Sequence, residues 1–324
     1  MIVRPLPILN SEDVPIDALM GKTVSIIGYG NQGRAHALNL RDSGIAISIA
    51  TRNQELAVQD KFETVSIAQA TSADLTIVAL PDEVQRDVYK ESIEPNLTSG
   101  TTLGFIHGFS VHYEHIAPPE GIGVVMVAPK GPGVTVRERF LANSGVPALL
   151  AVHQENSTNS ARNIALAWAA GIGSGRVGVI ESTFKDETET DLFGEQAIIV
   201  CGLVTLIKAS YETLVEAGYP PTLAYIECCH EVKQVADIIN GEGIATMMAA
   251  ISTTAESGAY EAMNLLDDEH LRSHLRTLLK NVQDGTFAKR LVNKSIESKR
   301  EELANHEIEQ IGKEFRSLTQ QDDE

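Results

Sequence analysis

Two pairs of acidic residues, each four positions apart, occur in the second half of the chain. Asp191 and Glu195 lie in "TDLFGEQAIIV", and Glu227 and Glu231 lie in "AYIECCHEVKQ". Residues four apart share one face of a helix, so each pair presents its two carboxylates together. If the two helices meet, repulsion among the carboxylates favours a bound cation. Oxygen donors without clustered cysteines favour Mg²⁺ over Zn²⁺.

Acidic residues with this spacing also occur where no metal binds. The N-terminus of a helix favours an acid by roughly 0.3–1 kcal/mol, and solvated helix faces carry acidic pairs as well. The spacing alone therefore leaves both interpretations open. His230 is the neighbour of Glu231 in sequence and points to another part of the helix surface. We interpret it as a structural histidine or as one that supports a ligand.

A glycine motif in the first half indicates a nucleotide site. In "VSIIGYGNQGRAHALNL" the residues Gly28, Gly30 and Gly33 follow a predicted strand and open a predicted helix. This context is typical of dinucleotide binding, in which the glycines let backbone approach the pyrophosphate at a helix N-terminus. The next strand ends in "IATRNQ", where Arg52 replaces the acid that usually binds the ribose hydroxyls of NAD. An arginine there favours the 2′-phosphate of NADP.

The elements that must position these residues divide the chain into two parts. From residue 22 to about 181, short β-rich runs alternate with segments of helical length, which predicts a doubly wound parallel α/β sheet. After about residue 183 the strand signals stop and long helical periods follow. We therefore predict a dinucleotide-binding domain over residues 1–182 and a helical domain over residues 183–324. The strand runs are "TVSIIG", "IAISIA", "DLTIVAL", "TTLGFI", "GVVMVAP" and "PALLAV".

Composition narrows the function classes. The formal net charge of −18 argues against general affinity for nucleic acid or an anionic membrane surface. The N-terminal segment lacks the pattern of a signal peptide, and the apolar stretch around residues 197–207 is too short to span a bilayer. Three cysteines, two of them adjacent, imply no disulfide framework. We expect a cytoplasmic enzyme that acts on a small molecule.

Long segments over nearly the whole chain resemble one family, the ketol-acid reductoisomerases, or acetohydroxyacid isomeroreductases, of isoleucine and valine biosynthesis. The matching segments occur in the family's order: "IIGYGNQGRAHALNLRDSG", "LPDEVQ", "HGFSVHY", "MVAPKGPG", "GVIESTFKDETETDLFGEQ", "ETLVEAGYPPTLAYIECCHE", "STTAE" and "VQDGTFAK". The resemblance implies a Rossmann-type domain followed by a knotted all-α domain, as in the family's short form. It also implies a homodimer or a larger homo-oligomer.

The resemblance assigns roles to particular residues. It implies that Asp191, Glu195, Glu227 and Glu231 bind two Mg²⁺ ions, with the second pair coming from the partner subunit. Catalytic roles fall on His107, Lys130 and Glu231, and a substrate contact falls on Ser252. The cofactor-binding positions are Gly28, Tyr29, Gly30, Asn31, Gln32, Gly33, Arg52, Asp82, Glu83, Val84, Gln85 and Gly133.

Some of these residues also have plain structural interpretations. His107 is equally suited to ending a strand, and Lys130 to a surface position beside a turn. Asp82 is suited to capping a helix, and Ser252 to an ordinary place in a helix or turn.

The activity that the resemblance implies is a two-step conversion with NADP(H) and Mg²⁺ as cofactors. A 2-hydroxy-2-alkyl-3-keto acid of the 2-acetolactate type undergoes alkyl migration, and hydride transfer then gives a 2,3-dihydroxy acid. The metals act as Lewis acids. Either Glu231 or a metal-bound hydroxide takes the hydroxyl proton.

Several segments depart from the family pattern. The loop after Arg52 is short and lacks the usual serines, which weakens the preference for NADP. Val134, Gln234 and the segment 257–263 also differ from the usual residues. Two alternatives therefore stay open among enzymes: a divergent paralogue, and a plain NADP-dependent reductase or dehydrogenase acting on another keto acid or an imine. A third is a non-catalytic NADP-binding protein.

Overall fold

Runs of β-branched and other apolar residues in the first half pair into one sheet. The computed structural model describes residues 6–291 and 296–319, and two compact units, Met1–Thr190 and Asp191–Glu324, divide inside a helix. In the described residues the sheet has nine strands in the order β1-β9-β8-β7-β6-β5-β2-β3-β4. The strands are β1 Ile8–Leu9, β2 Val24–Ile27, β3 Ile47–Ala50, β4 Glu63–Thr64, β5 Leu75–Val78, β6 Thr102–Phe105, β7 Gly123–Pro129, β8 Ala148–Gln154 and β9 Val179–Glu181.

The central strands are parallel, as the alternating pattern predicts, but β8 departs from that pattern. β8 pairs antiparallel with β7 and parallel with β9. The reason lies in the connection between β7 and β8. The amide of Lys130, just after β7, donates to the carbonyl oxygen of Pro147, just before β8. β8 therefore begins at the end of the sheet where β7 ends, and it runs antiparallel to β7.

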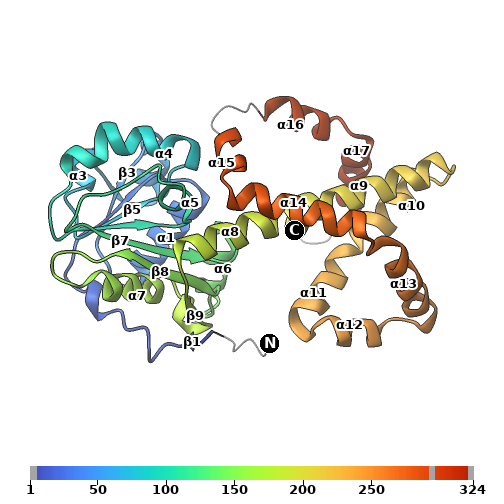
Figure 1. Ribbon diagram of the computed structural model, residues 1–324, viewed down its shortest axis with the longest axis horizontal. Helices are drawn as coiled ribbons and strands as arrows, with labels where there is room; N and C mark the ends of the chain where they lie inside the picture. Colours follow the sequence, from blue (N-terminus) through green and yellow to red (C-terminus); the bar gives the residue numbers. More distant parts are fainter. Residues whose placement is uncertain (1–5, 292–295, 320–324) are drawn as a thin grey trace. The chain divides into compact units, whose positions relative to one another are not determined.

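Helices cover both faces of this sheet (Figure 1). One face packs against two helices, residues 31–42 and 161–171, around the fully buried Trp168, and the other packs against the helical segments of residues 82–93 and 109–112. Both faces are apolar because the central strands are buried on both sides. The helical segments of this unit are η1 Asp17–Leu19, α1 Asn31–Asp42, α2 Gln54–Gln59, α3 Ile67–Ala70, α4 Asp82–Val88, η2 Tyr89–Ile93, η3 Glu94–Asn96, α5 Phe109–His112, α6 Gly133–Leu141, α7 Ala161–Gly171 and η4 Ser174–Arg176. Helix α8, Phe184–Gly194, begins here and crosses the division between the units.

The second unit is helical throughout its described residues, as the loss of strand signals predicts. Its core gathers around Tyr211, Ala224 and Tyr225, with Phe315 packed beside them. Its helical segments are η5 Glu195–Ile199, α9 Cys201–Glu216, α10 Pro221–Tyr225, η6 Ile226–His230, α11 Val232–Glu242, α12 Ile244–Ala250, α13 Thr253–Leu266, α14 Glu269–Gln283, α15 Thr286–Leu291, α16 Glu297–Ala304 and α17 Glu307–Thr319.

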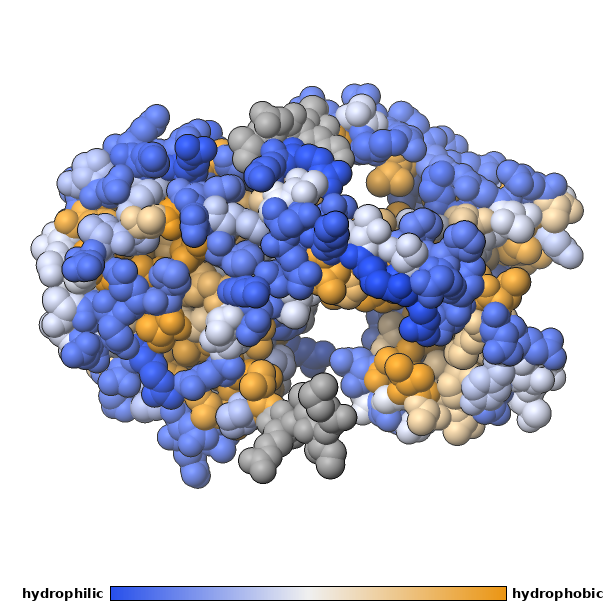
Figure 2. All heavy atoms as spheres, in the orientation of Figure 1, coloured by the Kyte–Doolittle hydropathy of each residue, from blue (hydrophilic) through white to orange (hydrophobic). Residues whose placement is uncertain are grey.

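Much apolar surface in this unit stays exposed. Figure 2 shows apolar side chains on the visible face around α12 and α13. Among the residues of these two helices, Ile244 and Leu265 are more than half exposed. Segments α8, η5 and α9 form one continuous helix, Phe184–Glu216, which by length and composition is apolar enough to cross a membrane. The sequence-based expectation rests only on the apolar stretch of residues 197–207, which is too short to span a bilayer. The longer helix that contains this stretch is not too short. Only 6% of its most apolar window is buried.

Candidate active site

The glycine-rich turn after β2 forms one wall of a cleft at the carboxyl ends of β2, β3 and β5. The cleft has a volume of about 1120 Å³. It lies beside the pairing of β2 with β5, where the strand order changes direction, and open α/β sheets bind their ligands at such points. The lining includes many of the predicted cofactor-binding residues, namely Gly28, Tyr29, Gly30, Asn31, Gln32, Arg52, Asp82, Val84 and Gln85.

Two of the predicted glycines, Gly33 and Gly133, do not line the cleft but pack against the backbone of the glycine-rich turn. A Cβ atom on Gly33 would lie 2.2 Å from the carbonyl oxygen of Gly28, and one on Gly133 would lie 2.2 Å from that of Asn31. Side chains at either position would push the backbone apart. Gly28 itself has a φ of +103°, a conformation that favours glycine. The tight turn therefore depends on glycine for both space and backbone conformation.

The remaining predicted cofactor positions lie at the start of α4. Asp82 is the first helical residue rather than the cap, and its Oδ1 accepts a hydrogen bond from Gln85 Nε2 at 3.0 Å. Gln85 Nε2 also donates to the carbonyl oxygen of Leu80 at 2.7 Å. Glu83 is exposed and does not line the cleft. The Asp82–Gln85 contact thus fixes this edge of the cleft, and Glu83 takes no part in it.

Arg52 lies in the loop between β3 and α2, where the sequence predicts contact with a ribose substituent. Its side chain is exposed and lines the cleft together with Asn53 and Gln54. Within residues 6–291 and 296–319, its guanidinium makes no hydrogen bond or ion pair. A cation held in this position is available to an anionic group of a bound nucleotide.

A buried carboxylate joins the ends of two strands to the first turn of α8. Glu187 is 1% exposed. Its Oε1 accepts a hydrogen bond from Lys130 Nζ at 2.8 Å, and its Oε2 accepts one from the Gly108 amide at 2.9 Å. The Nδ1 atom of His107 lies 3.1 Å from Oε1 and 3.0 Å from Oε2. His107 and Gly108 follow β6 and Lys130 follows β7, so both strand ends contact one carboxylate.

The surroundings of Glu187 keep it ionised. Burial alone would raise the pKa of its carboxyl group, but the hydrogen bonds and charges of His107 and Lys130 outweigh burial and lower the pKa from 4.5 to about 2. Gly108 allows the close packing that this requires. A Cβ atom there would lie 2.5 Å from Thr188 Oγ1 and 2.8 Å from the carbonyl oxygen of Phe184. The loop after β6 therefore rests directly on the first turn of α8.

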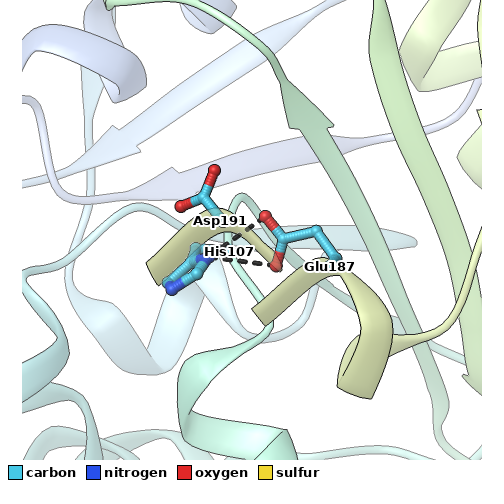
Figure 3. Close-up of side chains that lie close together, drawn as sticks. All are labelled: His107, Glu187 and Asp191. Carbon is cyan, nitrogen blue, oxygen red and sulfur yellow. Dashed lines mark hydrogen bonds and ion pairs between the residues drawn. The ribbon is translucent and has the colours of Figure 1, made fainter. Parts of the chain in front are cut away.

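Asp191 lies one turn beyond Glu187 on α8 and completes a group that is able to hold a metal ion (Figure 3). His107, Glu187 and Asp191 each offer a ligand atom, and these atoms lie within 4.8 Å of one another. No second group of three such residues occurs in the described part of the chain. Two carboxylates beside an imidazole are a donor set that divalent cations accept. Both oxygens of Glu187 accept hydrogen bonds from Lys130 and Gly108 in this structure, so a metal ion here competes with these donors.

The other predicted ligands lie elsewhere on the helices of the second unit. Glu195 is the first residue of η5, Glu227 lies within η6, and Glu231 directly follows η6. All three are exposed. Both η5 and η6 are π-helical, so the amide of Glu231 donates to the carbonyl oxygen of Ile226, five residues earlier, at 3.2 Å. The sequence predicts α-helical geometry for the second pair, whereas the structure has this wider turn.

Two further predicted residues have structural partners. Ser252 is the N-cap of α13, where its Oγ accepts a hydrogen bond from the Ala255 amide at 3.2 Å. The ring of His230 packs edge-on against Phe315, with centroids 4.9 Å apart. Each contact matches the plain interpretation of that residue, and a substrate contact by Ser252 stays a prediction.

Glu187 is the residue at this site that the sequence reasoning missed. It occurs in "FKDETETDLFGEQ", a run in which acids at a helix start need no other explanation. The available signal was its spacing, because it precedes Asp191 by one helical turn and shares its face.

We predict that Glu187→Gln removes part of the pH dependence of stability. The folded-state pKa is lowered, so the charged form stabilises the fold above about pH 4.5, and this contribution is lost as the pH falls toward 2. The shift corresponds to on the order of 3 kcal/mol. The measurement is urea unfolding followed by the fluorescence of Trp168, the chain's single tryptophan. The variant should have a lower free energy of unfolding at pH 7, and this free energy should fall less steeply than that of the wild type between pH 4.5 and 2.

Glu181→Gln is the matched control for this measurement. Glu181 forms an exposed ion pair with Arg162, and such pairs contribute about 0–1 kcal/mol. Equal losses for the two variants would contradict the role of Glu187.

Comparisons with known proteins find matches over both parts of the chain. Residues 18–178 match the acetohydroxy acid isomeroreductase NADPH-binding domain, and residues 184–321 match the ketol-acid reductoisomerase C-terminal domain. A solved NADH-preferring ketol-acid reductoisomerase from an uncultured archean is 40% identical, with a TM-score of 0.93 over 97% of this chain and 99% of that chain.

More distant structures share only the fold. A semialdehyde dehydrogenase NAD-binding protein from Cupriavidus necator is 16% identical, with a TM-score of 0.62 over 82% of this chain and 99% of that chain. A pyrroline-5-carboxylate reductase from Coxiella burnetii is 15% identical, with a TM-score of 0.55 over 85% and 99%. The predicted fold class, an α/β domain followed by a helical domain, is confirmed. The chain therefore belongs to the ketol-acid reductoisomerase family, the nicotinamide-dependent oxidoreductases of branched-chain amino-acid biosynthesis.

Proposed function

We propose that the protein converts a 2-hydroxy-2-alkyl-3-keto acid of the 2-acetolactate type to a 2,3-dihydroxy acid, with Mg²⁺ and NADPH. One observation carries the proposal. His107 lines the dinucleotide cleft and also belongs to the group formed with Glu187 and Asp191. A substrate beside this histidine has a hydride donor on one side and carboxylate ligands on the other.

The metal ligands in this proposal are Asp191 and Glu195, together with Glu227 and Glu231. Their oxygen donors suit Mg²⁺. A bound divalent cation supplies a Lewis acid that polarises the substrate's hydroxyl and carbonyl oxygens. Asp191 is half-buried beside the ionised Glu187, and this negative charge favours a cation there.

The chain's own side chains position the substrate and move its protons. Glu231 accepts the proton of the tertiary hydroxyl group. Lys130, held by Glu187 at 2.8 Å, keeps a positive charge near the oxygens that become negative during alkyl migration. His107 is oriented by the same carboxylate. Ser252 contacts the substrate.

We also propose a homodimer or larger homo-oligomer in which the second carboxylate pair comes from the partner subunit. The exposed apolar residues of the second unit support it, because such surface marks an interface. They include Ile198, Ile199 and Val200 on the continuous helix, each more than half exposed. In this interpretation residues 1–182 bind the cofactor in a cytoplasmic enzyme, and residues 183–324 bind metal and substrate and form the interface. No nucleic-acid or membrane partner is proposed.

A turnover assay tests the proposal. Purified protein with Mg²⁺ and 2-acetolactate should oxidise NADPH, and EDTA should abolish this oxidation, because the ligands would then hold no cation. Restoring Mg²⁺ should restore the rate. Turnover that chelation leaves unchanged would contradict the metal role. Cofactor binding without turnover on any 2-hydroxy-2-alkyl-3-keto acid would favour a non-catalytic protein.

For the cofactor, we predict that Arg52→Asp weakens NADPH binding more than NADH binding. The guanidinium lines the cleft with no partner among the described residues, and a bidentate arginine–phosphate contact is charge-assisted. Fluorescence titration with both cofactors measures the ratio. Both are needed because the 40% identical structure is described as NADH-preferring.

Arg139→Asp makes the same charge change at an exposed position of α6 outside the cleft. It should leave the NADPH-to-NADH affinity ratio unchanged. Equal losses for both cofactors in Arg52→Asp would show that Arg52 does not bind the 2′-phosphate.

A further inference from the structure

Two of the π-helical turns in the described residues carry carboxylates of the proposed metal site. Glu195 opens η5, and Glu227 lies inside η6, which ends directly before Glu231. In such a turn an amide bonds to the carbonyl group five residues earlier. The amide of Val200 donates to the carbonyl oxygen of Glu195 at 3.0 Å. π-Helical turns are rare and are frequent at functional sites.

The turn that starts at Glu195 depends on a glycine just beyond it. A Cβ atom on Gly202 would lie 2.2 Å from the carbonyl oxygen of Ala197, which belongs to the turn. Real Cβ contacts are essentially never shorter than 3.0 Å, and the obstacle is backbone rather than a flexible side chain. The φ angle of Gly202 is not in the left-handed region. This glycine is therefore required for the close approach of the carbonyl group.

The turn fixes where Glu195 points relative to the helix that follows. An α-helix advances by about 100° per residue, so one residue more or less within a turn rotates everything on one side of it by that angle. Helix α9 is anchored, because Tyr211 packs in the core with Ala224 and Tyr225. A lost π turn must therefore rotate the helix before it, which carries Asp191, or displace Glu195.

We infer that Gly202 is a positioning residue for the metal-binding carboxylates. It maintains the π turn after Glu195, and this turn orients the Asp191–Glu195 pair. The inference rests on the proposed function, because it assumes that these carboxylates bind a divalent cation.

Mn²⁺ titration of the full-length protein, followed by electron paramagnetic resonance, tests this inference without any turnover. Gly202→Ala should weaken Mn²⁺ binding by about 10- to 100-fold, the usual effect of losing a group that orients a metal ligand. Gly258→Ala is the matched control, because Gly258 lies on α13 and an added Cβ atom meets nothing within 4 Å. The control should bind Mn²⁺ like the wild type. NADPH affinity should be unchanged in both variants.

A double-mutant cycle separates positioning from general loss of structure. In a Glu195→Gln background, Gly202→Ala should add little further loss of Mn²⁺ affinity, because the oriented carboxylate is already gone. If Gly202→Ala does not fold, insertion of one alanine after the exposed Ile199 rotates the helix before α9 by about 100° and leaves Gly202 in place. This variant should show the same weak Mn²⁺ binding.

Three results would overturn the inference. Wild-type Mn²⁺ affinity in Gly202→Ala or in the variant with the inserted alanine shows that the turn does not position the ligands. Fully additive losses in the cycle show a structural role only. Failure of the wild type itself to bind Mn²⁺ overturns the proposed metal site and this inference with it, so the two failures are distinguishable.

Discussion

The buried carboxylate of Glu187 is the contact on which the site depends. A charge that is 1% exposed costs several kcal/mol unless it is paired and hydrogen-bonded. Lys130, His107 and the Gly108 amide supply these partners from the ends of β6 and β7. The same carboxylate lies in the first turn of α8, so the start of that helix cannot shift without leaving a charge unpaired. Asp191 follows one turn later on this fixed helix.

Close approaches of backbone bring the site together elsewhere in the chain. The glycine turn after β2 contacts the start of α6 at Gly133, the loop after β6 contacts α8 at Gly108, and η5 contacts the start of α9 at Gly202. Each contact is possible because glycine has no side chain, and no side-chain interaction is needed to form it. These backbone contacts restrict the segments that carry the polar side chains of the site. A small number of polar side chains is therefore enough to form it.

The sequence predicted the parts of this protein that local patterns determine. The glycine motif placed the dinucleotide cleft, since a strand, a tight turn and a helix within one short segment specify that geometry. The antiparallel β8 was not predicted, because its direction depends on how the segment between Pro129 and Ala148 returns. The π turns were also missed, since acids four apart look the same in an α- or a π-helix. Glu187 was hidden among the acids of "KDETET".

The central claim is that Asp191 and Glu231 belong to one catalytic site shared between two subunits. Its most direct test is the rate of 2-acetolactate conversion by Asp191→Asn, by Glu231→Gln and by a refolded mixture of the two. Each variant alone should lose isomerisation by orders of magnitude, whereas Asp186→Asn, an exposed change on the same helix, should retain it. The mixture should regain activity, because a mixed dimer contains one site with both residues intact. Near-native isomerisation by the separate variants, or a mixture as inactive as they are, would contradict the account.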